Sequence, residues 1–151
     1  MGEIRRGLIE VDLPARFQVL PGRPAVILDV AHNPQSAASL SVNLANMGFY
    51  RNTYAIFGML KDKDIASVAR VLKSQVNSWL IASISNERRG ATASDVAQEL
   101  LRAGVPQNAM SGFANPGEAY DEACNLAAEN DRIISFGSFH TVAGVLRRRS
   151  S

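Results

Sequence analysis

The sequence contains a single cysteine and only two histidines among its 151 residues. One cysteine excludes an internal disulfide framework. No Cys/His cluster has the spacing of a zinc site, so we expect no protein-bound metal. Cys124 stands among alanines at helical spacing, which predicts a buried, unreactive thiol rather than a nucleophile.

Long apolar runs and known nucleotide-binding loops are also missing. No run approaches the roughly 20 apolar residues of a membrane helix, and the first residues lack the apolar segment of a secretory signal. We therefore expect a cytoplasmic protein without a membrane partner. There is no G-x-G-x-x-G after a strand and no G-x-x-x-x-G-K-[ST] loop. The net charge is only +2 and its arginine pairs are dispersed, which argues against nucleic-acid binding.

Hydrophobic residues make up 46% of the chain, enough for a core of substantial size. Short apolar runs alternate with segments of helical period. The expected strands are 16–20, 25–30, 53–59, 78–84, 109–113 and 132–138. The expected helices are 33–48, 64–74, 92–104, 115–130 and 139–149. Their spacing places Leu101 on the apolar face of 92–104 and Phe139, with Val142, Ala143 and Leu146, on that of 139–149. We find no linker or repeat, so residues 1–151 are expected to form a single domain.

The strands are continuous apolar runs, which is typical of a parallel sheet covered by helices on both faces. Only "PGRP" separates the first two strands. Four residues cannot hold the crossover that parallel neighbours need, so the first strand is antiparallel to the second or lies at the sheet edge. The predicted fold is α/β: a Rossmann-like three-layer αβα domain with a mostly parallel six-stranded sheet, one antiparallel strand and about five helices.

Polar residues gather where strands lead into helices, in "DVAHNP", "GMLKDKD", "ISNERRGAT" and "GSFHT". Ligands of open parallel sheets bind beyond the carboxyl ends of the strands. Both histidines, His32 and His140, and two of the three lysines, Lys61 and Lys63, lie in these junctions. The pattern predicts a site there, although polar residues are common in any loop.

The first junction mixes helix punctuation with unexplained polar residues. Asn33 followed by Pro34 is explained by a helix start. Asp29 ends a buried strand, where a carboxylate is costly unless it is paired or faces a cleft; acids in this place commonly accept hydrogen bonds from ribose hydroxyls. His32 could donate to an anion at the helix start, or simply lie at the surface.

The remaining junctions leave similar alternatives. Lys63 could reach a substrate carboxylate, or belong to a solvated charged turn. Gly137 would allow the backbone to approach a ligand. Ser138 could bind that ligand or cap the last helix.

Three segments in this order, "LPARFQVLPGRPAVILDVAHNPQSA", "FGMLKDKDI" and "ISFGSFHTVAGVL", resemble the C-terminal domain of the bacterial bifunctional folylpolyglutamate synthases/dihydrofolate synthases of the Mur ligase superfamily. The resemblance extends from about residue 13 to residue 146. It implies a ligase that joins L-glutamate to dihydropteroate and to folates through an acyl phosphate made with ATP. It also implies that ATP and Mg²⁺ are held mainly by an N-terminal P-loop domain, which this chain lacks. The domain alone is then expected to be inactive.

The resemblance also implies roles for particular residues. Arg16 would contact ATP phosphate and Asp29 the ATP ribose, with His32 beside nucleotide and glutamate as the candidate catalytic residue. Ser138 would be the principal contact for glutamate. His140, Lys63 and Asn33 are further candidates for glutamate binding.

Two other functions remain open at this point. The missing P-loop is compatible with a freestanding regulatory module that binds a nucleotide or an amino acid. A cell-wall Mur ligase would share the fold, although "LDVAHNP" and "GSFHTV" are typical of the folate enzymes.

Overall fold

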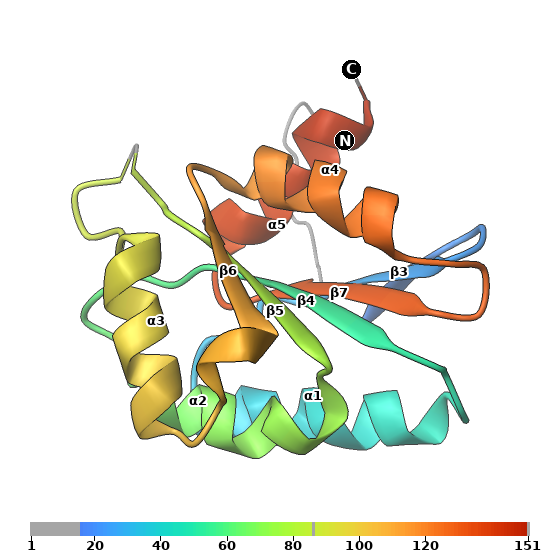
Figure 1. The fold of residues 1–151 in the computed structure, drawn as a ribbon, viewed down its shortest axis with the longest axis horizontal. Coiled ribbons are helices and arrows are strands. Elements are labelled where there is room, and N and C mark those ends of the chain that lie inside the picture. Colours follow the sequence, from blue (N-terminus) through green and yellow to red (C-terminus); the bar gives the residue numbers. More distant parts are fainter. Residues whose placement is uncertain (1–15, 86, 151) are drawn as a thin grey trace, which may run out of the picture.

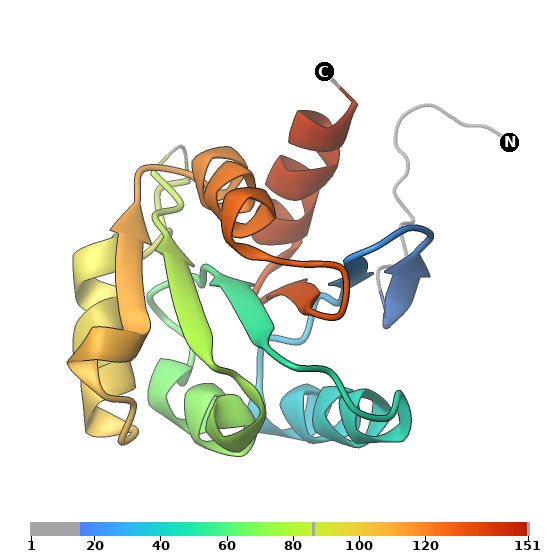
Figure 2. The same ribbon diagram turned by 45° about the vertical axis from the view of Figure 1, so that its right-hand side comes forward.

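The computed structural model describes residues 16–85 and 87–150, which form an αβα sandwich (Figures 1 and 2). Its sheet has the strand order β2-β3-β7-β4-β5-β6. Only the pair β2–β3 is antiparallel, and β2 lies at the sheet edge. The six strands are β2 (Gln18–Leu20), β3 (Ala25–Leu28), β4 (Thr53–Phe57), β5 (Ser78–Ala82), β6 (Met110–Phe113) and β7 (Arg132–Phe136). The predicted fold class is confirmed.

Helices cover both faces of the sheet, with α1 and α2 on one side and α4 and α5 on the other (Figure 1). Side chains of α3 join the core cluster of α1 and α2. The five α-helices of the described residues are α1 (Pro34–Asn46), α2 (Ile65–Leu72), α3 (Ala93–Arg102), α4 (Pro116–Leu126) and α5 (Phe139–Arg149). Two 3₁₀ turns, Lys73–Gln75 and Gln107–Ala109, complete the set. No helix in these ranges is long and apolar enough to span a membrane.

Each helix begins at a side-chain cap that satisfies one of its otherwise unpaired amides. At every helix start the cap accepts a hydrogen bond from the amide three residues later. The caps are Asn33, Asp64, Thr92, Asn115 and Ser138. Short polar side chains at these positions are readable in the sequence, so the starts of the helices were predictable to within a residue or two.

The ends of the elements were predicted less well. The four main parallel strands each stop two residues before their predicted ends, and α4 stops at Leu126 instead of residue 130. The two residues beyond each strand end lie in the loop that leads from that strand toward the next helix. These loops form the site described below.

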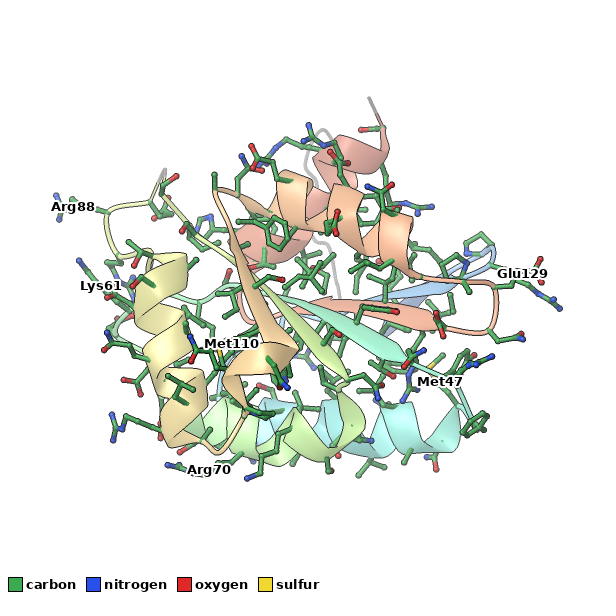
Figure 3. All side chains as sticks on the ribbon, viewed as in Figure 1. Met47, Lys61, Arg70, Arg88, Met110 and Glu129 are labelled. Carbon is green, nitrogen blue, oxygen red and sulfur yellow. The ribbon has the colours of Figure 1, made fainter. Side chains whose placement is uncertain are left out.

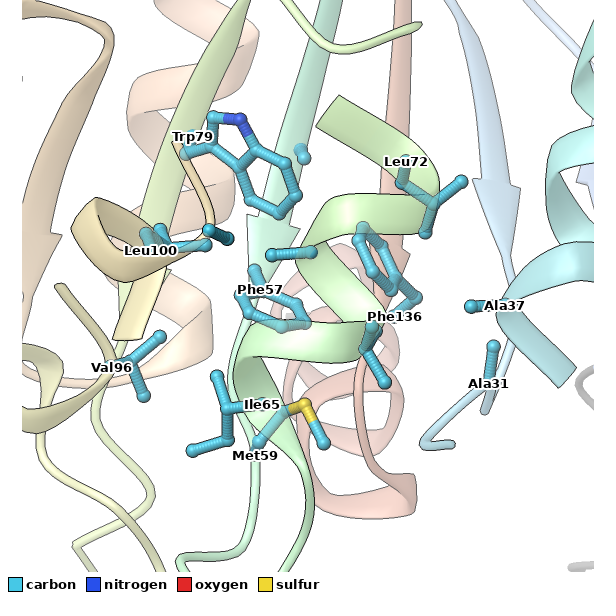
Figure 4. Packing of buried hydrophobic residues seen from close by; sticks show 14 of the residues in the cluster. Ala31, Ala37, Phe57, Met59, Ile65, Leu72, Trp79, Val96, Leu100 and Phe136 are labelled. Carbon is cyan, nitrogen blue, oxygen red and sulfur yellow. The ribbon is translucent and has the colours of Figure 1, made fainter. Parts of the chain in front are cut away.

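Three aromatic rings fill the core beneath these loops (Figure 4). The Phe57 ring centroid lies 4.8 Å from that of Phe136 and 5.2 Å from that of Trp79. All three side chains are fully buried. Phe57 ends β4 and Phe136 ends β7, so their packing holds the junctions that follow these two neighbouring strands in fixed relative positions.

A buried arginine lies at the opposite, N-terminal end of the parallel strands, where Arg132 begins β7. Arg132 donates from Nε to Thr53 Oγ1 at 2.8 Å and from Nη1 to the Leu44 carbonyl at 2.9 Å. Its guanidinium lies 4.9 Å from the centre of the Tyr50 ring. Burial lowers the pKa of Arg132. Since Leu44 is in the last turn of α1, this cation complements the carboxyl end of that helix.

Three predictions about burial were wrong. Cys124 is exposed, because α4 presents Ala119, Tyr120 and Ala123 to the sheet and Cys124 falls on the next face. In α3, Leu101 is exposed while Val96 and Leu100 are buried, which makes the apolar stripe narrower than predicted.

The buried face of α5 is also rotated from the predicted one. Phe139 is exposed, and the fully covered residues are Thr141, Val142, Gly144 and Val145. Gly144 explains the rotation, because a Cβ there would lie 2.8 Å from the Pro116 Cβ. The helix therefore packs its smallest residue against the start of α4. Hydrophobic periodicity does not predict such a contact, because glycine has no apolar side chain.

Candidate functional site

A cleft of about 380 Å³ opens at the C-terminal ends of the parallel strands, between the loops after β3, β4, β5 and β7. His32, Lys63, Ser138 and His140 all line it, although they lie up to 108 positions apart in sequence. The rest of the lining consists of Val30, Leu60, Arg89, Gly137 and Phe139. Of the residues predicted from sequence, Arg16, Asp29 and Asn33 are outside this lining.

His32 is held in one orientation by its own loop. Its Nδ1 lies 3.0 Å from the Val30 carbonyl oxygen, and its backbone amide donates to Ser36 Oγ at 3.1 Å. Since a carbonyl can only accept, Nδ1 carries a proton and Nε2 is the acceptor of the neutral ring. The loop thus leaves Nε2 to interact with a ligand.

Asn33 is occupied as a helix cap. Its Oδ1 accepts hydrogen bonds from the backbone amide and from the hydroxyl of Ser36, both at 2.8 Å. The Ser36 hydroxyl also accepts from the Asn33 amide at 3.2 Å, which completes a reciprocal capping box. The helix start accounts for Asn33, and only its side-chain NH₂ group is left for another partner.

Ser138 also caps a helix, but it lies in the cleft wall. Its Oγ accepts from the Thr141 amide at 3.1 Å and lies 2.9 Å from Thr141 Oγ1, which donates to the Gly58 carbonyl at 2.9 Å. This chain of bonds ties the start of α5 to the end of β4. The side chain therefore caps α5, which is one of the two roles that the sequence left open, and it also lines the cleft. Its contact with a ligand stays a prediction.

The loop after β5 folds back on the loop after β4 and supplies a residue that sequence reasoning missed. Residues Leu60 and Gly90 pair in an antiparallel bridge, and the Lys61 amide donates to the Arg89 carbonyl at 2.7 Å. Arg89 thereby reaches the cleft lining, where its guanidinium hydrogen-bonds Asp62. That bond holds the pKa of Asp62 below its ordinary value.

Gly90 is what allows this contact, because a Cβ there would lie 1.8 Å from the Ile84 carbonyl oxygen. The glycine in "RRGAT" was the available signal for a close approach.

Lys63 is a cation in the cleft lining, close enough to Asp62 to lower the pKa of that carboxyl slightly further. No hydrogen bond or ion pair of the described residues engages the Lys63 ammonium. His140 Nε2 lies 3.9 Å from Glu87 Oε1 at the rim. Lys61 projects from the same loop as Lys63, and Arg88 projects from the loop after β5. Figure 3 shows both side chains on one side of the molecule, with Glu129 on the opposite side. The Lys63 ammonium therefore makes this cleft suited to a small carboxylate ligand.

Asp29 follows β3 and is only 8% exposed. Its Oδ1 accepts from the Ala31 amide at 2.9 Å and its Oδ2 from the Phe17 amide at 3.2 Å. Burial raises the pKa of Asp29, although these two amides and the nearby charge of Arg16 act in the opposite direction. The exposed Arg16 and buried Asp29 thus form a second polar group beside the cleft.

Asp29 gives a testable pH dependence of stability. A carboxyl group whose pKa is higher in the folded than in the unfolded state stabilises the fold when it is protonated, at pH values below its unfolded pKa. That stabilisation is lost as the pH rises through the folded pKa. We therefore expect Asp29→Asn to lower the free energy of unfolding less at about pH 7 than at about pH 3. Urea unfolding of both proteins across this range measures the difference, and parallel stability profiles would contradict it.

Taken together, the sheet topology and the position of the cleft define the chain as an α/β domain with a polar cleft at the C-terminal ends of its parallel strands, where ligands of such sheets bind. Residues 15–139 match the family model of the Mur ligase, glutamate ligase domain. The chain belongs to this family.

Curated relatives and solved structures agree with this assignment. The chain is 39% identical over 143 residues to the dihydrofolate synthase/folylpolyglutamate synthase of Escherichia coli, covering 95% of the chain and 32% of the relative. It is 32% identical over 141 residues to the protein of the same name in Buchnera aphidicola subsp. Schizaphis graminum, covering 93% and 32%. The chain therefore spans about a third of the length of the curated relatives it matches.

Among solved structures, E. coli FolC in complex with DHPP and ADP superimposes with a TM-score of 0.82 at 38% identity, covering 92% of this chain and 32% of that one. The Yersinia pestis bifunctional enzyme has a TM-score of 0.80 at 37% identity, with the same two coverages. A further structure of a bifunctional folylpolyglutamate synthase/dihydrofolate synthase, with Mn, AMPPNP and L-glutamate bound, has a TM-score of 0.81 at 37% identity. These similarities confirm the predicted family.

Proposed function

We propose that this chain is the C-terminal domain of an ATP-dependent ligase that adds L-glutamate to dihydropteroate and to folates. The observation that carries the proposal is the convergence of His32, Lys63, Ser138 and His140 on one cleft. The cleft is large enough for an amino acid and presents cations to its carboxylates. The folate enzymes among the relatives favour this function over a cell-wall ligase and over a freestanding regulatory module. The enzyme is proposed to act in the cytoplasm.

In the proposed reaction, the γ-phosphoryl group of ATP passes to the acceptor carboxylate. The glutamate amine then attacks the resulting acyl phosphate, and phosphate leaves. The residues of this chain bind and orient the reactants. Arg16 contacts ATP phosphate, Asp29 lies at the nucleotide site, and Lys63 holds a glutamate carboxylate, with Ser138, His140 and Asn33 as further glutamate contacts. His32 accepts a hydrogen bond at Nε2 between the two ligands.

The metal is assigned to another part of the enzyme. Among residues 16–85 and 87–150, no group of three or more His, Cys, Asp or Glu side chains could hold a metal ion. The described residues therefore do not fit a Mg²⁺ site. We propose that an N-terminal P-loop domain holds Mg²⁺, most of the nucleotide and the pterin, and that this chain is inactive without it.

Trans-complementation tests the proposal. The chain is mixed with the P-loop domain of its parent enzyme, and glutamate incorporation into dihydropteroate and tetrahydrofolate is followed by mass spectrometry with and without ATP. ATP-dependent incorporation that needs both parts is expected. Association of two folded parts without any incorporation would count against the proposal.

Lys63 provides a test of the glutamate site. We expect Lys63→Met to raise the KM for glutamate about tenfold, because one charge-assisted contact to a carboxylate is lost. The KM for ATP is expected to stay within about twofold. Lys61→Met is the matched control, since Lys61 is an exposed lysine of the same loop outside the cleft lining. Equal effects of the two substitutions would show that only general charge is involved.

A further inference from the structure

We infer that Arg89 is a substrate-binding residue that selects a dicarboxylic amino acid: its guanidinium binds the side-chain carboxylate of the incoming glutamate. The inference rests on the proposed function, in which Lys63 holds a glutamate carboxylate in the same cleft. L-glutamate has two carboxylates. A lysine ammonium is a single point charge, so the second carboxylate calls for a second cation. Besides Lys63, Arg89 is the one lysine or arginine in the cleft lining of the described residues.

The backbone of Arg89 is fixed to the loop that carries Lys63. The Arg89 carbonyl accepts from the Lys61 amide at 2.7 Å, and the next residue, Gly90, pairs with Leu60 in an antiparallel bridge. The two cations therefore stand on loops that are hydrogen-bonded to each other. Their backbone positions are set before any ligand binds, which is what a selective site requires.

The Arg89 guanidinium is held by only one of its three nitrogens. Nη2 donates to Asp62 Oδ2, and this is the one hydrogen bond of the Arg89 side chain within residues 16–85 and 87–150. Nε and Nη1 also carry N–H groups and remain as donors for another acceptor. Arg89 lines the cleft, whereas Asp62 does not. Asp62 thus orients the guanidinium from outside the cleft and leaves it donors for a carboxylate ligand.

Both side chains of this pair are about half exposed, Arg89 at 55% and Asp62 at 50%. The exposure leaves the guanidinium accessible to a ligand from the solvent. Ion pairs as exposed as this one contribute little to folding stability. Substitutions at either residue are therefore expected to leave the chain folded, so that their effects on ligand binding can be measured.

The strand order indicates which carboxylate each cation takes. The strands whose loops form the cleft lie in the order β3, β7, β4 and β5 across the sheet. The proposed nucleotide contacts, Arg16 and Asp29, are at the β3 end, whereas Lys63 follows β4 and Arg89 follows β5. The glutamate amine must face the acyl phosphate, and the α-carboxylate is attached to the same carbon as the amine. Lys63 therefore takes the α-carboxylate, and Arg89, on the loop farther from the nucleotide, takes the side-chain carboxylate.

The first test measures binding without a reaction. The ¹⁵N-labelled chain is titrated with L-glutamate and with L-glutamine, which has the same shape but an uncharged side chain, and amide and arginine Nε resonances are followed by NMR. Arg89→Gln is expected to weaken glutamate binding about tenfold and to change glutamine binding less than about twofold. Lys63→Met is expected to weaken the binding of both amino acids. Arg89→Lys keeps the charge without the planar fork and is expected to restore part of the glutamate affinity.

Two further variants separate ligand binding from loop structure. Arg88→Gln is the matched control, since Arg88 is an exposed arginine of the same loop outside the cleft lining, and it is expected to change both affinities less than about twofold. Asp62→Asn retains Arg89 but removes its ion pair, and is expected to weaken glutamate binding less than about threefold. In the complemented enzyme, the KM for glutamate is expected to follow the same order among the variants.

Three outcomes overturn the inference. Equal weakening of glutamate and glutamine by Arg89→Gln would show that the guanidinium does not recognise the side-chain carboxylate. An unchanged glutamate affinity in Arg89→Gln would show that the cleft binds its ligand without this cation. An effect of Asp62→Asn as large as that of Arg89→Gln would show that the pair only holds the two loops together.

The two measurements also separate this inference from the proposed function. If the complemented enzyme incorporates no glutamate, the proposed function fails, and the NMR comparison decides the role of Arg89. If the isolated chain binds glutamate too weakly to titrate, the KM values of the complemented enzyme decide it. If neither measurement detects glutamate, the inference and the proposed function both fail.

Discussion

Replacing Arg16 with alanine is expected to lower kcat/KM for ATP-dependent ligation in the complemented enzyme by roughly 10- to 150-fold. The loss corresponds to about 1.5–3 kcal/mol, the usual contribution of a hydrogen bond to a charged group. Arg16 is exposed and lies beside the buried Asp29, so its guanidinium is available to an anionic ligand. Phosphoryl transfer depends mainly on positioning and on charge stabilisation of this kind.

Two variants make this result specific. Arg23→Ala is the matched control, since Arg23 is an exposed arginine at the other end of the same hairpin, 3.8 Å from Glu129. It is expected to leave the kinetics within about twofold. Arg16→Lys retains the charge without the planar fork and is expected to recover only part of the activity. Steady-state assays over ATP concentration measure all three, and unchanged kinetics in Arg16→Ala would refute the assignment.

Replacing Gly137 with alanine is expected to destabilise the chain by about 3 kcal/mol or more, the combined cost of backbone strain and overpacking. Gly137 joins β7 to α5 with a φ of +113°, and a Cβ there would lie 2.3 Å from the Gly58 carbonyl oxygen. Neither backbone can retreat freely, because Gly58 donates to the Phe136 carbonyl and accepts from Thr141 Oγ1. The clash between the added Cβ and the Gly58 carbonyl oxygen therefore lies in the wall of the cleft, which Gly137 lines.

Gly22→Ala separates the two causes of this loss. Gly22 has a similar φ of +121°, but nothing lies within 4 Å of the added Cβ. It is expected to cost about 1 kcal/mol, the strain alone. Urea unfolding of both variants gives the difference, which measures the clash. Equal destabilisation of the two would mean that the Gly58 contact relaxes at no cost.

The helix starts show what local sequence can predict. A cap such as Asn33 or Asn115 accepts a hydrogen bond from an amide three residues later, so four consecutive residues of the sequence are enough to predict it. The continuous apolar strands likewise indicated a parallel sheet. The four-residue link after the first strand predicted that this strand is antiparallel to the second or lies at the sheet edge, and β2 does both. The motif order also led to the correct family.

Other features depended on packing between distant segments. The rotation of α5 follows from contact between Gly144 and Pro116, and the placement of Arg89 follows from the fit of Gly90 against Ile84. A glycine in the sequence signals that a close approach is possible, but it does not say which distant segment will make that approach. The exposure of Cys124 similarly reflects which face of α4 meets the sheet.

The sequence by itself therefore determined the class of fold, the positions where helices begin and the four loops that could carry a site. These follow from local hydrogen bonding and from hydrophobic pattern, which act over a few residues. Only the tertiary structure decided that β7 lies between β3 and β4, and this order brings the loops of His32, Lys63 and Ser138 to one cleft. It also decided that Asp29 faces the Phe17 amide, because a bond between segments twelve positions apart exists only once the hairpin has joined the sheet.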